Sequence, residues 1–248
     1  FDRTNNKIIL NRQGQIFLRY VNQVFSSLDC AKAELRQSVM LQGQHVSIAT
    51  VASTQWVDMI TAFSQEHPHF TLSCTSLKRS ELAANGLSAR FSFLLATEND
   101  VPLYYQNELD SMYLFEDHPV VMVHKDHPIA NRSSVSLNEL LEETIFLPME
   151  DYPLHDKLVN LFAGCSIPFP VGNAHSHLTS QQMVVQGLGI AFSTMHTAKN
   201  TALSLCYVPI SDQYVPWISR LYWRKSHAFT KDEALFKNFL EQYYKNLM

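Results

Sequence analysis

The sequence has few of the residues that mark disulfide-rich, metal-binding or membrane-spanning proteins. Its 248 residues include four cysteines, and no two of them form a Cys-x-x-Cys pair. Isolated thiols of this kind fit reduced, buried side chains of the cytoplasm better than a disulfide framework or a zinc site. No apolar run approaches the roughly 20 residues that a membrane-spanning helix needs. The net charge of −4 argues against the whole chain being a nucleic-acid-binding surface.

The sequence also lacks the motifs of common enzyme classes. It has no Gly-x-Ser-x-Gly elbow, no Cys-His pairing signal and no phosphate-binding Walker loop, and the Gly-Leu-Gly of residues 187–189 lacks the rest of a dinucleotide fingerprint. Two histidine pairs are candidate metal ligands: His124 with His127, and His175 with His177. No cysteine or acid accompanies either pair at ligand spacing, so surface or hydrogen-bonded histidines are favoured. The sequence therefore predicts no catalysis, no metal and no cofactor.

What is present is the composition of a globular protein, with 46% apolar residues. A chain of this length can bury a sizeable core in more than one lobe. It begins with Phe1 and has no initiator methionine there, and its first residues do not resemble a signal peptide. We therefore expect a fragment of a longer protein, whose start lies upstream.

The most informative stretch is residues 11–41. Its apolar residues recur at steps of four and three, as in the seam between two paired helices. They are Phe17, Val21, Val24, Leu28, Ala31 and Leu35. Asn11 can cap the start of this helix, and no proline interrupts it. A helix of roughly 40 Å needs a partner along its length, and it either packs on its own domain or pairs with a second subunit; we favour the second.

After Gly43 the pattern changes to two α/β cycles. Residues 45–50, 70–74 and 91–96 read as strands separated by helices, and this order predicts a parallel sheet with helices on its faces. A second cycle runs from about residue 112 to 223 and contains capping signals at Ser136 and at the Pro153 helix start. A final helix follows the capping box at Thr230. Two lobes with a cleft between them are expected.

In several motifs, taken in order, the chain resembles the LysR-type transcriptional regulators. The matching stretches are residues 10–14, 46–54, 67–68, 121–128, 184–191 and 224–225. They resemble the start of a linker helix, the first strand and helix of the effector-binding domain, an apolar strand with a His-Pro pair, a Gly-Leu-Gly-Ile segment and the C-terminal return. One departure is Ser92, where the family often has an aspartate.

The resemblance implies an α/β fold of two Rossmann-like subdomains, like the type 2 periplasmic binding proteins, behind a long linker helix. The implied segments are 1–10 as the end of a DNA-binding wing, 11–42 as the linker and dimerisation helix, 45–117 with 225–248 as subdomain I, and 118–224 as subdomain II. Most of a winged helix-turn-helix would lie upstream, with Arg3 and Lys7 near the DNA backbone. A small effector would bind between the subdomains, and the protein would be a cytoplasmic homodimer or a tetramer.

Candidate effector contacts lie where strands end and helices begin, because free backbone amides there attract polar groups. The first lobe supplies Thr50, Ser53, Thr54 and Ser80; the second supplies Pro148, Met149, Glu150, Asn173, His175 and Ser176. Ser53 or Thr54 can equally be a simple helix cap. Glu150 and Asp151 can also be caps, but if they face the cleft they would repel a carboxylate. We hypothesise a small organic acid as the effector.

Two other classes of protein compete with this interpretation. A two-lobed solute-binding protein of a transport system would share the fold outline, but it would be a monomer with a signal peptide and no long helix. An α/β enzyme would need a reactive constellation that the sequence does not display.

Overall fold

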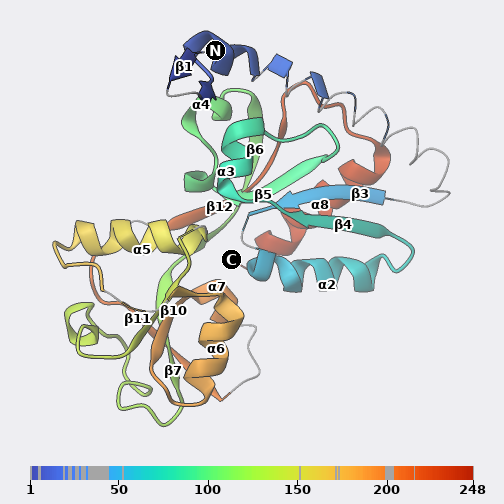
Figure 1. Cartoon of the computed structure of the whole chain (residues 1–248). Coiled ribbons are helices and arrows are strands. Elements are labelled where there is room, and N and C mark those ends of the chain that lie inside the picture. The colour runs from blue at the N-terminus through green and yellow to red at the C-terminus, as the bar shows by residue number, and fades with distance from the viewer. Residues whose placement is uncertain are drawn as a thin grey trace.

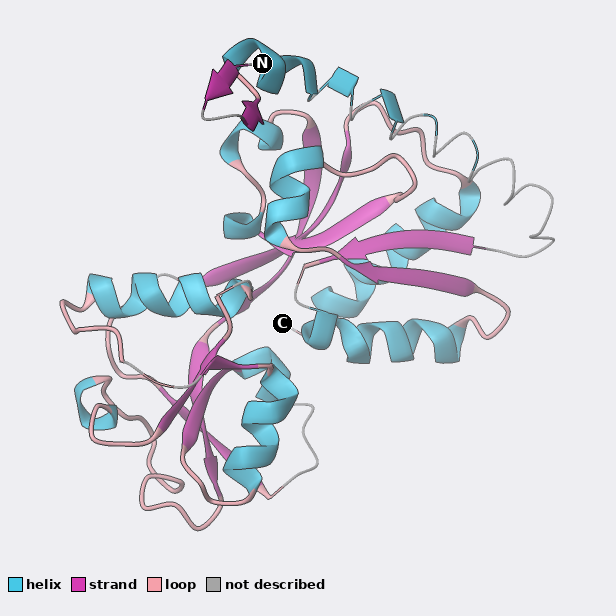
Figure 2. Ribbon diagram, in the orientation of Figure 1, coloured by secondary structure: helices cyan, strands magenta, loops and turns pink. Residues whose placement is uncertain are grey.

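The computed structural model describes residues 2–4, 7–18, 20–21, 24–25, 28, 32, 45–51, 53–150, 152–170, 172, 174–198, 204–214 and 216–247. It has two lobes, each built on a five-stranded sheet with helices on its faces (Figure 1 and Figure 2). A short N-terminal hairpin of β1 (Asp2–Thr4) and β2 (Lys7–Ile9) precedes them.

The first lobe combines segments from both ends of the body. Its elements are β3 (His45–Thr50), η1 (Ser53–Trp56), α2 (Val57–Glu66), β4 (Thr71–Ser76), α3 (Arg79–Asn85), β5 (Phe93–Thr97), η2 (Glu98–Asp100), α4 (Leu103–Gln106), β6 (Leu109–Asp117), β12 (Trp217–Arg224) and α8 (Lys231–Lys245). The sheet order is β4-β3-β5-β12-β6. Strands β3, β4 and β5 are parallel, as the sequence predicts, whereas β12 runs antiparallel to β5 and β6.

The second lobe is formed by one continuous stretch of chain. Its elements are β7 (Pro119–His124), η3 (Asn138–Leu140), β8 (Ile145–Pro148), α5 (Pro153–Gly164), β9 (Ala174–His175), α6 (His177–Val185), β10 (Ile190–Thr194), α7 (Met195–Ala198) and β11 (Leu205–Pro209). The sheet order is β11-β7-β10-β8-β9. Strands β8, β9 and β10 are parallel, while β7 is antiparallel to β10 and β11.

Helices cover both faces of the first sheet, which explains the continuous burial of β5. On one face, Phe63 of α2 meets Phe236 of α8 edge to face, with ring centroids 5.1 Å apart. On the other face, Leu82 of α3 and Tyr105 near the end of α4 close a second apolar cluster. Since a buried aromatic side chain contributes several kcal/mol of stability, roughly 3–5 by truncation to alanine, these clusters fix the layers of the lobe.

The Gly-Leu-Gly segment between α6 and β10 has a steric cause. Gly187 has a φ of 69°, in the left-handed region that glycine adopts without cost, and this ends α6. At Gly189 a Cβ atom would lie 2.3 Å from the carbonyl oxygen of Thr144. Glycine at this position therefore allows Ile190 to reach that same carbonyl with its N–H at 2.9 Å, beside β8.

Two antiparallel strands connect the lobes. The chain leaves the first sheet at Asp117, the end of β6, and returns at Trp217, the start of β12, and these two residues are register partners. Helix α5 lies between the lobes (Figure 1). Its Asp156 forms an ion pair with Arg79 of α3, and Lys157 places its Nζ 4.8 Å from the centroid of the Trp217 ring. Burial lowers the pKa of Lys157.

The predicted elements and the observed ones agree in most places. The capping box at Thr230 forms as expected, with the Thr230 hydroxyl accepting a backbone N–H bond. Ser176, predicted as an effector contact, caps α6 in the same way. At Ser136 the capping contacts with Glu139 form, but only a short 3-10 turn follows. Five short elements were not predicted: β1, η2, α4, β9 and α7. The three strands predicted to be parallel in the first lobe are parallel, and each sheet also contains antiparallel strands whose direction was not predicted.

The predicted long helix is described only in its first part. Residues 12–18 are helical, as are the described residues 20, 21, 24, 25, 28 and 32. Asn11 accepts a bond from the N–H of Gly14 at 2.8 Å, and so caps the helix as the sequence predicts. Ala31 and residues 33–41, with Leu35 among them, lie outside the described residues.

Candidate functional site

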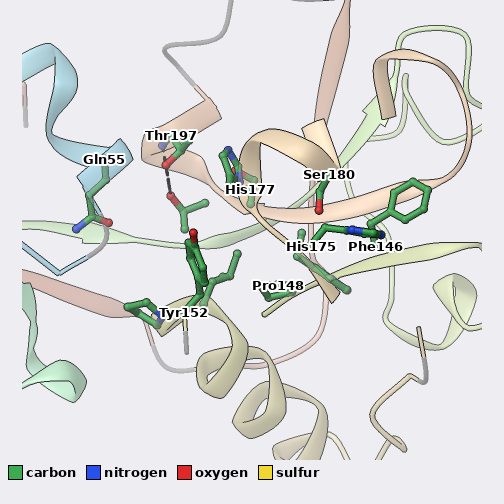
Figure 3. A pocket seen from close by; sticks show the side chains of 13 residues that line it. Gln55, Phe146, Pro148, Tyr152, His175, His177, Ser180 and Thr197 are labelled. Carbon is green, nitrogen blue, oxygen red and sulfur yellow. Dashed lines mark hydrogen bonds between the residues drawn. The ribbon is translucent and has the colours of Figure 1, made fainter. Parts of the chain in front are cut away.

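A cavity of about 100 Å³ lies where η1 of the first lobe faces the second lobe. Figure 3 shows Gln55 approaching it from η1, opposite Tyr152, His177 and the other side chains of the second lobe. Twelve of its thirteen wall residues belong to the second lobe, and Gln55 is the exception.

The cavity forms at the carboxyl ends of three parallel strands. Pro148 is the last residue of β8 and His175 the last residue of β9, and the two are register partners. Thr194 ends the neighbouring β10, and its Oγ1 bonds the hydroxyl of Thr197 in α7 at 3.1 Å. This edge of an α/β sheet is where ligands commonly bind, because the strands end and the helices begin there.

The helix starts beside the cavity follow from local sequence. Pro153 stands at the first position of α5, where its missing N–H is not needed. Ser176 caps α6 by accepting a hydrogen bond from the Thr179 N–H at 3.2 Å. These two starts place Leu154 and His177 in the wall.

Three buried polar atoms around the cavity have no hydrogen-bond partner among the described residues. They are Gln55 Nε2, His175 Nε2 and Ser193 Oγ. Gln55 is 5% exposed and Ser193 is 1% exposed. An unpaired buried polar group costs roughly 1–3 kcal/mol, so these atoms form a set that a bound molecule could satisfy.

The remaining wall is apolar and uncharged. Phe146, Phe192, Pro148 and Leu154 supply apolar surface, and among the described residues no Asp, Glu, Lys or Arg lies in the wall. Burial lowers the pKa of His177, so its ring is neutral at pH 7. Phe146 and the His175 ring stand edge to face with centroids 6.0 Å apart, which holds the imidazole in place.

A second, more polar cavity of about 430 Å³ lies on the other side of the loop after β8. Arg79 lies in it between two carboxylates, in the ion pair with Asp156 and with its Nε 3.5 Å from Asp100 Oδ1. Asp100 is 3% exposed, and its other oxygen accepts bonds from Thr97. This guanidinium is therefore already paired with two acids.

The structure divides the predicted effector contacts between these two cavities. Pro148 and His175 line the first cavity, and Ser80 and Glu150 line the second. Thr50 is buried, with its Oγ1 unpaired, but it is in neither wall. Met149 is 38% exposed and lines neither cavity.

Other predicted contacts have structural roles or cannot be placed. Ser176 contributes the cap of α6. The side chains of Ser53 and Thr54, and Asn173 and Asp151 as a whole, lie outside the described residues. Ser92 hydrogen-bonds Glu233 at the start of α8, in the first lobe.

Sequence reasoning missed most of the polar wall. Gln55 follows the predicted pair of caps directly, and Ser193 and Thr194 end an apolar strand. A polar residue at the carboxyl end of a buried strand is a usable signal, because strand ends in α/β sheets face ligand sites. Ser180 lies inside α6 and Thr197 inside α7, so neither carried such a signal.

Two searches of the described residues returned nothing. No group of three or more His, Cys, Asp and Glu side chains there could hold a metal ion. Among the described helices, none is long and apolar enough to cross a membrane.

Comparisons with known proteins relate these features to a family. The family profile described as LysR substrate binding domain matches residues 44–245. The HTH-type transcriptional regulator YybE of Bacillus subtilis is 28% identical over 195 residues, which cover 77% of this chain and 65% of YybE. The chain thus spans just under two thirds of that relative.

Solved structures share the fold. The regulatory domain of CcmR from Synechocystis PCC6803, in complex with 2-PG, has a TM-score of 0.68 at 17% identity and covers 82% of this chain and 98% of its own. The effector-binding domain of QuiR, in complex with shikimate, has a TM-score of 0.62 at 16% identity and covers 83% and 99%. The predicted two-lobed α/β fold of the type 2 periplasmic-binding-protein kind is confirmed. The chain, matched over both lobes, belongs to the LysR substrate-binding domain family.

Proposed function

We propose that this chain is the effector-binding and oligomerisation region of a LysR-type transcriptional regulator. A small molecule enters the cavity between η1 and the carboxyl ends of β8, β9 and β10. The observation that carries this proposal is the set of three unpaired buried polar atoms, contributed by both lobes, around one apolar cavity. Because Gln55 comes from the first lobe, a ligand that bonds it favours one arrangement of the lobes over others.

We extend the proposal to the segments predicted from the sequence. Residues 1–10 end a DNA-binding wing, 11–42 form the linker helix, 45–117 with 225–248 form subdomain I, and 118–224 form subdomain II. Strand β12, residues 217–224 of this last segment, pairs with the first sheet along its whole length, so these residues belong to the first lobe and the second lobe ends at residue 216. Strands β6 and β12 are then the two crossing strands. Arg3 and Lys7 lie in the hairpin β1–β2, and their charges suit contact with a DNA backbone.

The linker helix supports an assembly of two copies. Phe17 is 70% exposed, Val24 is 68% exposed and Leu28 is 49% exposed. Apolar side chains at this spacing are buried when the helix pairs with its copy. The alternative, a two-lobed solute-binding protein, does not account for a helix with exposed apolar residues at this spacing.

The gene-regulatory setting places the protein in the cytoplasm, without catalysis and without a resident cofactor. Promoter DNA would be bound by a winged helix-turn-helix outside this chain. An acid was the effector hypothesised from the sequence, and 2-PG and shikimate are the molecules held by two structural neighbours.

Sedimentation equilibrium at about 20 µM tests the assembly. We expect a dimer, and the substitution Val24→Glu should shift the equilibrium towards monomer because it buries a charge in the seam. Val57→Glu, on an exposed residue of α2, is the matched control. A wild-type monomer would contradict the proposal.

The sensing role has its own test. In the longer protein with its DNA-binding domain, a compound that raises the melting temperature should also change the DNase protection pattern on the upstream promoter. Compounds that stabilise the protein and never alter its DNA contacts would argue against regulation.

A further inference from the structure

The charge of the cavity wall limits the chemical class of molecule that can enter it. None of the thirteen wall residues that the structure describes is Asp, Glu, Lys or Arg. A carboxylate transferred from water into such a site loses several kcal/mol of hydration that only a cation or several hydrogen-bond donors can replace. An ammonium group would lack a counter-charge in the same way.

The described cationic side chains of the two neighbouring cavities are already engaged. Arg79 opens onto the second cavity, where Asp156 and Asp100 both pair with it. Lys157 lies over the Trp217 ring and faces a different part of the interface. His177 is in the wall, but burial disfavours its charged form.

The backbone N–H donors at the starts of α5 and α6, the two helices of the second lobe that begin beside the cavity, are also limited. Helix α5 begins with Pro153, which has no N–H, and it carries Asp156 in its first turn. Helix α6 is capped by Ser176, whose hydroxyl accepts a hydrogen bond from the otherwise free N–H of Thr179. Two of the usual ways to bind an anion at helix ends are therefore weakened here.

The polar atoms that remain free suit a neutral ligand. Gln55 Nε2 is a donor, Ser193 Oγ can donate or accept, and His175 Nε2 does one or the other according to its tautomer. Two phenylalanines and two prolines give flat apolar surface beside them. The cavity of about 100 Å³ is smaller than the cavity of about 150 Å³ that accommodates benzene in an engineered protein. Its size therefore limits the ligand to about a single ring.

We propose that the effector of this chain is an uncharged, single-ring compound with a carbonyl or similar acceptor for Gln55 and one further hydrogen-bonding group, and not a carboxylic acid. The inference rests on the proposed function, because it assumes that this cavity is the sensing site. It departs from the organic acid hypothesised from the sequence.

Matched pairs of probes test the class directly. The pairs are benzamide with benzoate, cyclohexanecarboxamide with cyclohexanecarboxylate, and methyl shikimate with shikimate, each titrated by calorimetry at pH 7.5. We expect the uncharged member to bind at least tenfold more tightly in every pair that binds. Equal or tighter binding of a carboxylate overturns the proposal, and so does a panel in which no uncharged member binds.

Two variants and one control show where the probes bind. Thr197→Trp fills the cavity, and Leu188→Trp, at an exposed residue outside the wall, is its control. Gln55→Met keeps the length of the side chain and removes its donor. We expect Thr197→Trp to abolish binding of the amides, Leu188→Trp to leave it unchanged and Gln55→Met to weaken it five- to tenfold.

The same variants distinguish failure of the proposed ligand class from failure of the proposed sensing site. Tight binding of a carboxylate that Thr197→Trp abolishes would refute the neutral class and leave the sensing site standing. Binding that neither Thr197→Trp nor Gln55→Met changes would refute the cavity as the sensing site as well.

Discussion

At the scale of single residues, the site carries a built-in cost. Gln55 and Ser193 are almost fully buried, yet each has a polar atom without a partner. A residue selected for stability alone would be apolar at such a position, because the hydration of the amide is lost and nothing replaces it. The cost is explained if a ligand supplies the missing bond.

The first prediction concerns this cost in the absence of ligand. Gln55→Met should raise the free energy of unfolding by about 1 kcal/mol, since it removes an unsatisfied buried amide and keeps most of the volume. Urea denaturation measures it, with Gln65→Met on the exposed face of α2 as the control. A loss of stability in Gln55→Met would show that the amide is satisfied in the free protein.

The second prediction concerns acid. Burial lowers the pKa of His177 in the folded protein below the 6.5 of the unfolded chain, so the unfolded state binds its proton first. Stability should therefore fall as the pH drops below about 6.5. In His177→Gln this part of the loss should vanish between pH 7.5 and 5.5, whereas exposed His69→Gln should follow the wild type. Parallel unfolding curves for all three proteins would contradict it.

Residue by residue, sequence reasoning found the strand ends better than the cavity wall. Pro148 and His175 were predicted because a strand precedes and a helix follows them, and both line the cavity. Gln55 and Ser180 were missed, because only the packing of one lobe against the other, or of a helix against a sheet, brings them there. The assignment of all these residues to effector binding stays a prediction.

At the scale of elements, capping residues and the spacing of apolar residues were enough to predict where helices begin. The Thr230 capping box and the proline at Pro153 gave two helix starts correctly, since both signals depend on residues close in sequence. Strand direction could not be predicted in the same way. Strands β12 and β6 pair across about a hundred residues of chain, and no local pattern encodes that pairing.

The third prediction concerns the start of α6. Ser176→Ala should cost about 1 kcal/mol of stability, because the Thr179 N–H loses its acceptor. Ser176→Asn restores an acceptor and should recover most of the loss. Thermal denaturation distinguishes these variants. Wild-type stability in Ser176→Ala would mean that water caps the helix equally well.

At the scale of the whole molecule, the contact between the lobes rests on charged groups of unequal exposure. Asp156 is half exposed, whereas the side chain of Asp100 is 1% exposed. Arg79 joins both. A buried charge that loses its partner is far more costly than an exposed one, so the two sides of this contact should respond differently to substitution.

The fourth prediction follows from that asymmetry. Arg79→Met should lower the free energy of unfolding by about 2–3 kcal/mol, because it removes the guanidinium that pairs with the buried Asp100. Asp156→Asn should cost less than about 1 kcal/mol, because the carboxylate is exposed to solvent. Chemical denaturation of the two variants gives the comparison. Equal losses would show that Arg79 acts mainly through Asp156.

The pairing of Asp117 with Trp217 makes the second lobe an insertion whose two ends are cross-strand neighbours, about 5 Å apart. A gene segment for residues 118–216 could therefore be exchanged between relatives at two crossover points that lie side by side in the fold, without stretching the strands that receive it. Twelve of the thirteen cavity residues would travel with that segment. Recombination could thus give the regulator a new chemical signal in one event, while the linker helix and the first lobe stay as they are.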